Sequence, residues 1–264
     1  MGYKIIDFHT HPFLNASENI CNHKQFFTMN VDTTRETFEK LGVSHICGSV
    51  ISIEPLQENE SVWDRVQANN QTALTLAKYY QGFYIPGFHI HPDYKTESLN
   101  EIEKMSGLGV KILGELVPYI HHYQGYAHKN LDEILDCATD KNMLVSIHSM
   151  GNDEMDEMVK RHKDTLFIAA HPGEYGDLMR HIARAKWSEN YYIDLSGYGM
   201  FRHGMLRRLI DEIGVDKILF GSDYPTCNPA MYIGGVLLDD LITPEEKQKI
   251  FYDNAKRLLG LEGV

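Results

Sequence analysis

Eight short apolar runs, separated by segments with helical punctuation, constrain the fold of this chain more than any other feature of its sequence. The runs are rich in Val, Ile and Phe and lie at residues 3–8, 45–52, 83–89, 109–115, 143–148, 166–170, 191–195 and 217–221. Strands that alternate with helices form parallel sheets. Eight such repeats predict an α/β fold of the (β/α)₈ TIM-barrel type, because open doubly wound sheets more often contain about five to seven strands.

Helix starts between these runs carry capping patterns, in which a small polar residue precedes an acidic residue by three positions. Such pairs occur at Thr33 and Glu36, Ser61 and Asp64, Ser98 and Glu101, Asn130 and Glu133, and Thr243 and Glu246. No linker rich in Pro, Gly or Ser interrupts the alternation. A length of 264 residues suits one barrel, so we expect a single domain over residues 1–264.

Composition limits the partners of this domain. Hydrophobic residues make up 43% of the chain, which excludes a disordered chain and allows a sizeable core. The balance of 25 Lys and Arg against 37 Asp and Glu gives a net charge of −12. Because nucleic-acid binding depends on unopposed cations, this balance argues against nucleic acid and disfavours an anionic membrane. We expect a small-molecule substrate, and the sequence is compatible with a homo-oligomer.

The cysteines and the N-terminus bear on the compartment. The four cysteines lie far apart, form no CxxC pair and belong to a chain too large to need disulfides. The N-terminus lacks a basic region followed by the apolar run of a signal peptide, and no apolar stretch approaches the roughly 20 residues that span a bilayer. We expect a cytoplasmic protein with reduced thiols.

Ionisable side chains follow five of the eight predicted strands at the point where each strand ends. They are His9 and His11 after the first run, Glu115, His148, His171 and Asp223. In a barrel these ends meet at one mouth, and the two-residue period of a strand places His9 and His11 on the same side. Nitrogen and oxygen ligands of this kind suit Zn, Mn, Fe or Ni.

Each of these residues alone has a simpler interpretation. A single His148 after an apolar strand is more often a hydrogen-bonded core histidine, and Asp223 fits a turn. The chain also contains a second His-x-His pair, His89 and His91, so that spacing alone is weak evidence. The combination favours a metal-lined mouth, because ionisable groups after so many apolar strands would be costly to bury in a structural core.

The ordered set of motifs resembles the amidohydrolase superfamily, specifically its amidohydrolase-related family. The motifs are Asp7-x-His9-x-His11, the histidines His148 and His171, the segment Gly-Ser-Asp-Tyr-Pro at 221–225 and the closing Asn-Ala-Lys-Arg-Leu-Leu-Gly at 254–260. The resemblance covers essentially the whole chain. It implies a metal-dependent barrel enzyme in which His9, His11, His148 and Asp223 hold one metal. In this family pattern His171 is either a further ligand or a residue that orients the attacking water.

Gly114-Glu115 is similar to the Gly-Glu of TatD-type metal-dependent hydrolases, in which the glutamate bridges two metals. The segment at 87–92, which contains His89 and His91, is also similar to a segment of that family. The residues after Glu115 and the Gly-Ser before Asp223 differ from the TatD pattern. We therefore expect an amidohydrolase-related chain with a TatD-like fourth strand, in which Glu115 bridges two ions. The alternative is that Glu115 accepts a hydrogen bond from a ligand histidine, while His9, His11, His148 and Asp223 hold a single ion and His171 orients the water. His91 is then expected to face the substrate or to support a ligand.

The loops after the fourth and seventh strands are rich in aromatic residues and histidines. We expect Tyr119 and His122 in the first loop to contact substrate, although a solvated surface loop has the same composition. Arg202 in the second loop suits a carboxylate or phosphate group of a substrate, and it equally suits a surface cation.

The leading prediction is hydrolysis of an amide, lactone or ester by a metal-activated water, with zinc as the favoured metal and one or two ions. Asp223 would take a proton from the water and pass it to the leaving group. The alternatives are non-oxidative decarboxylation of an aromatic or unsaturated acid, as in relatives within this family, and a TatD-type phosphodiesterase or nuclease. A non-catalytic ligand-binding barrel is disfavoured by the intact ligand set.

Overall fold

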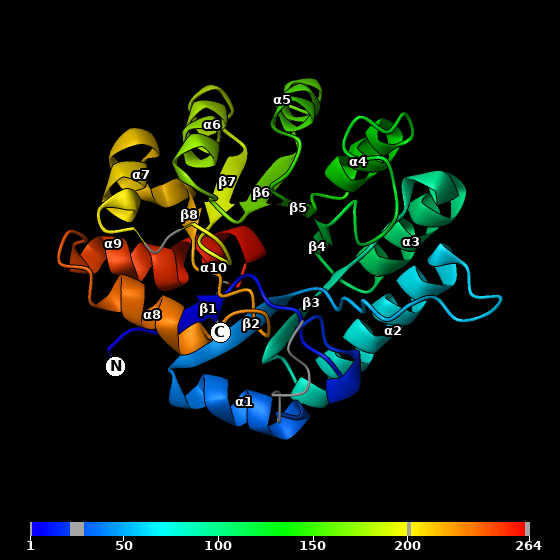
Figure 1. Cartoon of the computed structure of the whole chain (residues 1–264), viewed down its shortest axis with the longest axis horizontal. Helices are drawn as coiled ribbons and strands as arrows, with labels where there is room; N and C mark the ends of the chain where they lie inside the picture. The colour runs from blue at the N-terminus through cyan, green and yellow to red at the C-terminus, as the bar shows by residue number, and fades with distance from the viewer. Residues whose placement is uncertain (1, 22–28, 200–201, 262–264) are drawn as a thin grey trace.

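The computed structural model describes residues 2–21, 29–199 and 202–261, and strands alternate with helices throughout (Figure 1). The strands are β1 (Ile5–Asp7), β2 (Val43–Gly48), β3 (Tyr84–Phe88), β4 (Ile112–Leu116), β5 (Leu144–His148), β6 (Leu166–Ala170), β7 (Tyr191–Asp194) and β8 (Ile218–Leu219). They form an eight-stranded sheet in chain order, in which each strand pairs in parallel with the next. Each strand overlaps one of the eight predicted runs.

Backbone hydrogen bonds between the segments after β1 and β8 close this sheet into a barrel. The amide of Phe8 donates to the carbonyl of Phe220 at 2.8 Å, and Thr10 forms a parallel bridge with Tyr224. The amide of Asp223 donates to the carbonyl of His9 at 2.9 Å. The predicted (β/α)₈ barrel is therefore confirmed, and its closing seam brings Asp223 beside the first strand.

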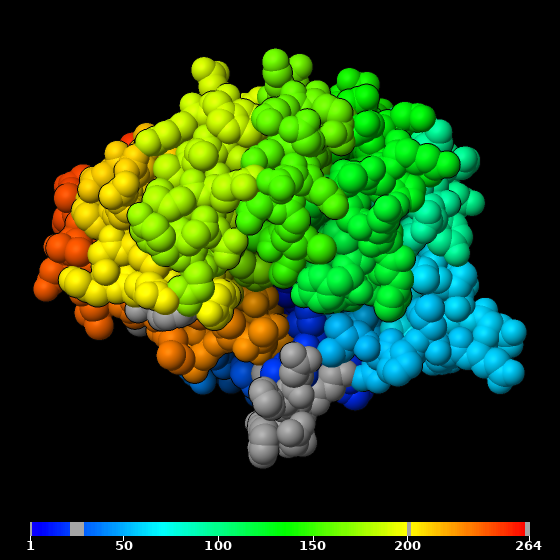
Figure 2. All heavy atoms as spheres, turned by 45° about the horizontal axis from the view of Figure 1, so that its top comes forward, coloured from blue at the N-terminus to red at the C-terminus, as the bar shows by residue number. Residues whose placement is uncertain are grey.

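Helices cover the outside of the barrel (Figure 1). They are α1 (Val31–Lys40), α2 (Val62–Tyr80), α3 (Lys95–Gly107), α4 (Leu131–Asp140), α5 (Asn152–Arg161), α6 (Tyr175–Trp187), α7 (Met205–Ile213), α8 (Pro229–Leu237), α9 (Pro244–Gln248) and α10 (Asn254–Leu259). A π-helical segment at Lys249–Asp253 joins α9 to α10. Figure 2 shows the segment before α2, in light blue, projecting from the body of the molecule. No helix of the described residues is long and apolar enough to cross a membrane.

The apolar core has two parts. The larger part lies between the strands and the surrounding helices. The smaller part fills the barrel and takes at least one apolar side chain from each strand, among them Ile6, Cys47, Ile85, Ile112, Leu144, Ile168, Tyr192 and Leu219. Ala255 and Leu259 of α10 pack against this second cluster. The α10 end of the barrel is thus filled, and the opposite end, where the strands finish, holds the polar side chains.

Three helix starts differ from the capping patterns in the sequence. Asn130 precedes α4, but its side chain makes no capping hydrogen bond. The cap of α1 is Asn30, whose side chain accepts from the amide of Thr33, so the helix begins earlier than the pair at Thr33 suggests. Ser98 lies inside α3, and its hydroxyl exchanges hydrogen bonds with the backbone of His91. The expected capping boxes form at Ser61 with Asp64 and at Thr243 with Glu246.

Candidate metal centre

Six side chains that the sequence marks as metal ligands lie together at the mouth of the barrel. They are His9 and His11 after β1, Glu115 in β4, His148 at the end of β5, His171 after β6 and Asp223 after β8. The ligand atoms of His9, His11 and Asp223 lie within 4.8 Å of one another, as do those of His9, Glu115 and His171. The barrel geometry thus brings together residues that are up to 214 positions apart, from His9 to Asp223.

His9 and His11 present their Nε2 atoms to each other across 3.1 Å. The Nδ1 atom of His11 lies 2.9 Å from the carbonyl of Ser49, which only accepts, so the proton of neutral His11 is on Nδ1. The Nδ1 atom of His9 lies 3.0 Å from Asp194 Oδ2, and the same tautomer follows. In their neutral forms both Nε2 atoms therefore direct lone pairs at one point, which is the arrangement that a metal cation requires.

Glu115 lies between two groups of imidazoles. Its Oε2 atom is 3.4 Å from the Nε2 atoms of both His9 and His11. Its Oε1 atom is 2.8 Å from His148 Nδ1 and 3.4 Å from His171 Nε2. Each carboxylate oxygen thus faces a separate pair of histidines, and Glu115 is only 4% exposed.

Asp223 completes the first group. Its Oδ1 atom lies 3.7 Å from His9 Nε2 and 3.5 Å from His11 Nε2. The backbone of Asp223 has a left-handed φ of 63° and that of His171 a φ of 60°. Non-glycine residues seldom adopt this conformation, and they do so most often at functional sites, where the surrounding structure holds them. Gly197 after β7 packs so close to His171 that a Cβ atom there would lie 2.2 Å from His171 Nδ1.

Electrostatics at the mouth favour charged carboxylates beside the histidines. Burial raises the pKa of Glu115, but the imidazoles of His9 and His148 hold this pKa well below its usual range. Burial likewise opposes the charge of His9, but the carboxylates of Asp194 and Glu115 raise the pKa of this imidazole well above its usual value. A cation in the mouth would take the place of the protons that these groups otherwise share.

Asp194 also lies at this centre, and the sequence motifs did not predict it. It ends β7, it is fully buried, and its Oδ2 atom holds His9 through the 3.0 Å contact with Nδ1. The signal was present, because Asp194 follows an apolar strand in the same way as the predicted ligands do. Carboxylates that orient a ligand histidine in this manner are a common feature of metal sites.

Two adjoining cavities open over the centre. The first has a volume of about 220 Å³ and is lined by the ligands and by apolar side chains that include Ile53, Val117 and Ile120. The second has a volume of about 340 Å³ and shares His148, His171 and Asp223 with the first. Tyr119 lines the first cavity, and its ring centroid is 5.2 Å from that of His148.

The other three residues predicted to contact substrate do not line either of these cavities. His91 is buried, with Nε2 donating to the carbonyl of His121 and Nδ1 accepting from the amide of Asp93, so both ring nitrogens are used by the backbone. These backbone contacts hold the ring of His91, and its expected role, facing the substrate or supporting a ligand, stays a prediction. His122 is exposed at a left-handed turn and does not line the first cavity. Arg202 pairs with Glu174 at 2.5 Å and lines a separate cavity beside α8.

Comparison with protein families identifies one match that spans nearly the whole chain. The family model described as amidohydrolase matches residues 6–261. No curated protein sequence matches the chain. The matched range thus spans every residue of the candidate centre.

Solved structures with the same fold include decarboxylases and a hydrolase. The 2,6-dihydroxybenzoate decarboxylase from Rhizobium is 14% identical with a TM-score of 0.75, and the match covers 99% of this chain and 100% of that one. Dihydroxybenzoic acid decarboxylase from Polaromonas sp. JS666, with bound manganese and an inhibitor, is 14% identical with a TM-score of 0.74, and the match covers 99% of this chain and 98% of that one. A probable 2-pyrone-4,6-dicarboxylic acid hydrolase from Acinetobacter baumannii is 15% identical with a TM-score of 0.66, and the match covers 97% of this chain and 99% of that one.

Proposed function

The chain belongs to the amidohydrolase family and is a metal-dependent enzyme of that superfamily, and we propose that it hydrolyses a small-molecule amide, lactone or ester. The observation that carries this proposal is the position of Glu115, whose two oxygens face two separate pairs of histidines at 2.8 to 3.4 Å. A carboxylate in this position suits a bridge between two ions, and two-metal centres are typical of hydrolases.

The donor set fits transition metals. His9, His11 and Asp223 would hold one ion, His148 and His171 would hold a second, and Glu115 would contact both. Imidazole nitrogens and carboxylate oxygens suit zinc, and they also suit manganese, the metal bound in the decarboxylase from Polaromonas. When bound, such ions lower the pKa of water and polarise the bond to be cleaved.

The residues of this chain supply proton transfer and positioning. Asp223 has a carboxylate at the mouth, 11% exposed, where it can take a proton from the attacking water and return it to the leaving group. Asp194 holds His9, and the carbonyl of Ser49 holds His11, so both imidazoles keep a fixed orientation. Tyr119, at the rim and 57% exposed, offers a hydroxyl and a ring to a bound substrate.

The size and lining of the mouth support a small, partly apolar substrate. The two cavities of about 220 and 340 Å³ suit a compact molecule. Ile53, Val117 and Ile120 would contact its apolar part, while the ligands face the reacting bond.

An activity panel tests hydrolysis against decarboxylation. Protein reconstituted with zinc or with manganese is incubated with lactones, amides and esters, with acid release followed in a pH-stat, and with aromatic carboxylic acids, with release of CO₂ measured. We expect metal-dependent acid release from at least one compound and no CO₂. Release of CO₂ from an aromatic acid, without hydrolysis of any compound in the panel, would show that the proposal is wrong. Chelator-treated protein is the control.

A further inference from the structure

A groove lies at the end of the barrel opposite the candidate metal centre. It runs between α2 and α3, passes the starts of β3 and β4, and ends at the turn after α10. Its volume is about 830 Å³, within the roughly 300 to 1,000 Å³ of ordinary ligand sites. None of its lining residues belongs to the mouth cavities, so the groove is a separate feature.

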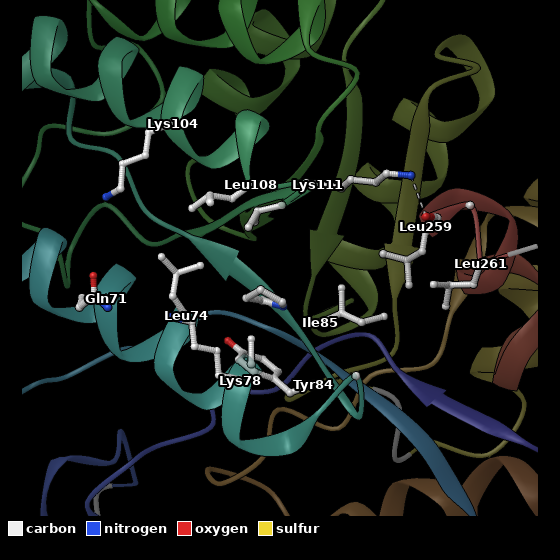
Figure 3. Close-up of a pocket in the computed structure, with 16 residues that line it drawn as sticks. Gln71, Leu74, Lys78, Tyr84, Ile85, Lys104, Leu108, Lys111, Leu259 and Leu261 are labelled. Atoms are coloured by element: carbon white, nitrogen blue, oxygen red, sulfur yellow. Dashed lines mark hydrogen bonds between the residues drawn. The ribbon is translucent and has the colours of Figure 1, made fainter. Parts of the chain in front are cut away.

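The walls of the groove are largely apolar. Leu74 of α2 lies on one side, Leu108 on the other and Leu261 at the far end (Figure 3). Ala77 and Val110 also line the groove. Leu108 borders the groove and is 59% exposed. The groove thus presents apolar surface that the described part of the chain leaves uncovered.

The charges at the groove are all positive. Lys78, Lys104 and Lys111 line it, whereas no Asp or Glu is among the described residues that line it. This is the reverse of the whole chain, which carries a net charge of −12. Lys78 and Lys104 extend from the facing helices α2 and α3 (Figure 3).

The three ammonium groups differ in the partners that they contact within the protein. Lys104 is shared with Glu101, which lies 3.0 Å away. Lys111 donates to the carbonyl of Leu259 at 3.0 Å, which is a neutral partner. Lys78 is exposed and has no hydrogen-bond or ion-pair partner among the described residues. Lys78 is therefore the cation most available to an anion.

We propose that this groove binds a free carboxylic acid with an extended apolar chain, such as a medium-chain fatty acid. The carboxylate would interact with Lys78 and the neighbouring lysines, and the chain would lie along Leu74, Leu108 and Leu261. The positive rim selects against a cationic head group of the same length. The apolar walls supply affinity in proportion to the chain length that they cover.

Dodecanoate binding, measured by isothermal titration calorimetry on the metal-loaded protein, tests this proposal. One full methylene burial strengthens binding about fourfold, so dodecanoate should bind at least about tenfold more tightly than octanoate in this open groove. Dodecyltrimethylammonium should bind at least about tenfold more weakly than dodecanoate. Lys78→Glu should weaken dodecanoate binding by about threefold or more, and Lys40→Glu, on the exposed side of α1, should leave it unchanged.

Other outcomes would overturn the proposal. Loss of dodecanoate binding when the metal is removed by a chelator would place the carboxylate at the metal centre. In that case Leu108→Glu, a change at an exposed side chain, would leave dodecanoate binding unaffected. Binding by a chain that ends at Leu261, but not by the full chain, would mean that the last residues of the protein occupy the groove. No binding, together with a dimer that Leu108→Glu dissociates, would assign the groove to a second copy.

Discussion

Asp194 fixes the direction in which His9 presents its Nε2 atom, because its carboxylate holds Nδ1 at 3.0 Å. We predict that Asp194→Asn weakens metal binding about 10- to 100-fold, as the loss of a carboxylate behind a ligand histidine does in other metal sites. Competition with a chromogenic zinc chelator measures this change directly.

Asp216→Asn is the matched control for this measurement, since Asp216 is 66% exposed and pairs with Lys249 far from the mouth. Its metal affinity should equal that of the unaltered protein. Equal affinity in Asp194→Asn as well would mean that His9 is oriented by the barrel backbone alone, and the role assigned to Asp194 would be lost.

Single residues also show what the sequence was able to predict about the centre. The six predicted ligands converge because each follows a strand, and the barrel brings strand ends together by topology alone. His89 and His91 have the same spacing as His9 and His11, yet the ring of His91 is hydrogen-bonded to the backbone of Asp93 and His121. Spacing gives the side of the strand on which a residue lies, but it gives no information on the loop that packs over it.

A buried ion pair joins α5 to α6. Arg184 is fully buried, and its Nε atom lies 2.5 Å from Asp156 Oδ1. Removal of the carboxylate leaves the guanidinium charge buried without its partner, so we predict that Asp156→Ala lowers the free energy of unfolding by about 3 kcal/mol. Urea unfolding followed by circular dichroism measures the loss.

The pH dependence of this pair has a definite sign. Burial raises the pKa of Asp156, but the guanidinium groups of Arg184 and Arg180 hold this pKa below its usual value. Its stabilisation is therefore complete above the ordinary Asp pKa of about 4 and is lost as the pH falls through the lower folded-state pKa. Asp156→Ala should show a weaker acid dependence, whereas Asp153→Ala, at a side chain 94% exposed, should change stability by less than about 0.5 kcal/mol. Identical losses in the two variants would contradict the prediction.

The elements were predictable where local chemistry decides them. The boxes at Ser61 and Thr243 form as expected because both partners lie within one turn. Ser98 instead bonds the backbone of His91, a tertiary contact that sequence does not reveal. The second strand ends early, at Gly48, where φ is 134° and a Cβ would lie 2.1 Å from the carbonyl oxygen of Thr10.

Over the whole molecule, the contacts between the segments after β1 and β8 join the two ends of the sheet, and we propose that residues 1–264 form one domain on that basis. The alternation of strands and helices was sufficient to predict this closure. The conformations of the loops over the mouth were not predictable. Arg202 pairs with Glu174 and His122 is exposed, and neither feature follows from the periodicity of the sequence.

The net charge of −12 leads to a prediction about polymeric substrates. We expect the metal-loaded protein not to nick plasmid DNA at physiological salt, because attraction to phosphates supplies most non-specific DNA binding. Gel electrophoresis of supercoiled plasmid measures nicking, with an ester from the activity panel as the positive control. Efficient metal-dependent nicking would favour the phosphodiesterase alternative.

The number of metal ions required for activity tests the central claim most directly. Apoprotein is titrated with zinc while hydrolysis is followed, and the bound metal is counted by mass spectrometry. We predict full activity at about two equivalents per chain, and for Glu115→Gln about one equivalent with a loss of about 100-fold or more in turnover. Glu103→Gln, at a side chain 59% exposed, should behave as the unaltered protein. Full activity at one equivalent, with the same single ion bound by Glu115→Gln, would contradict the bridged centre and favour decarboxylation.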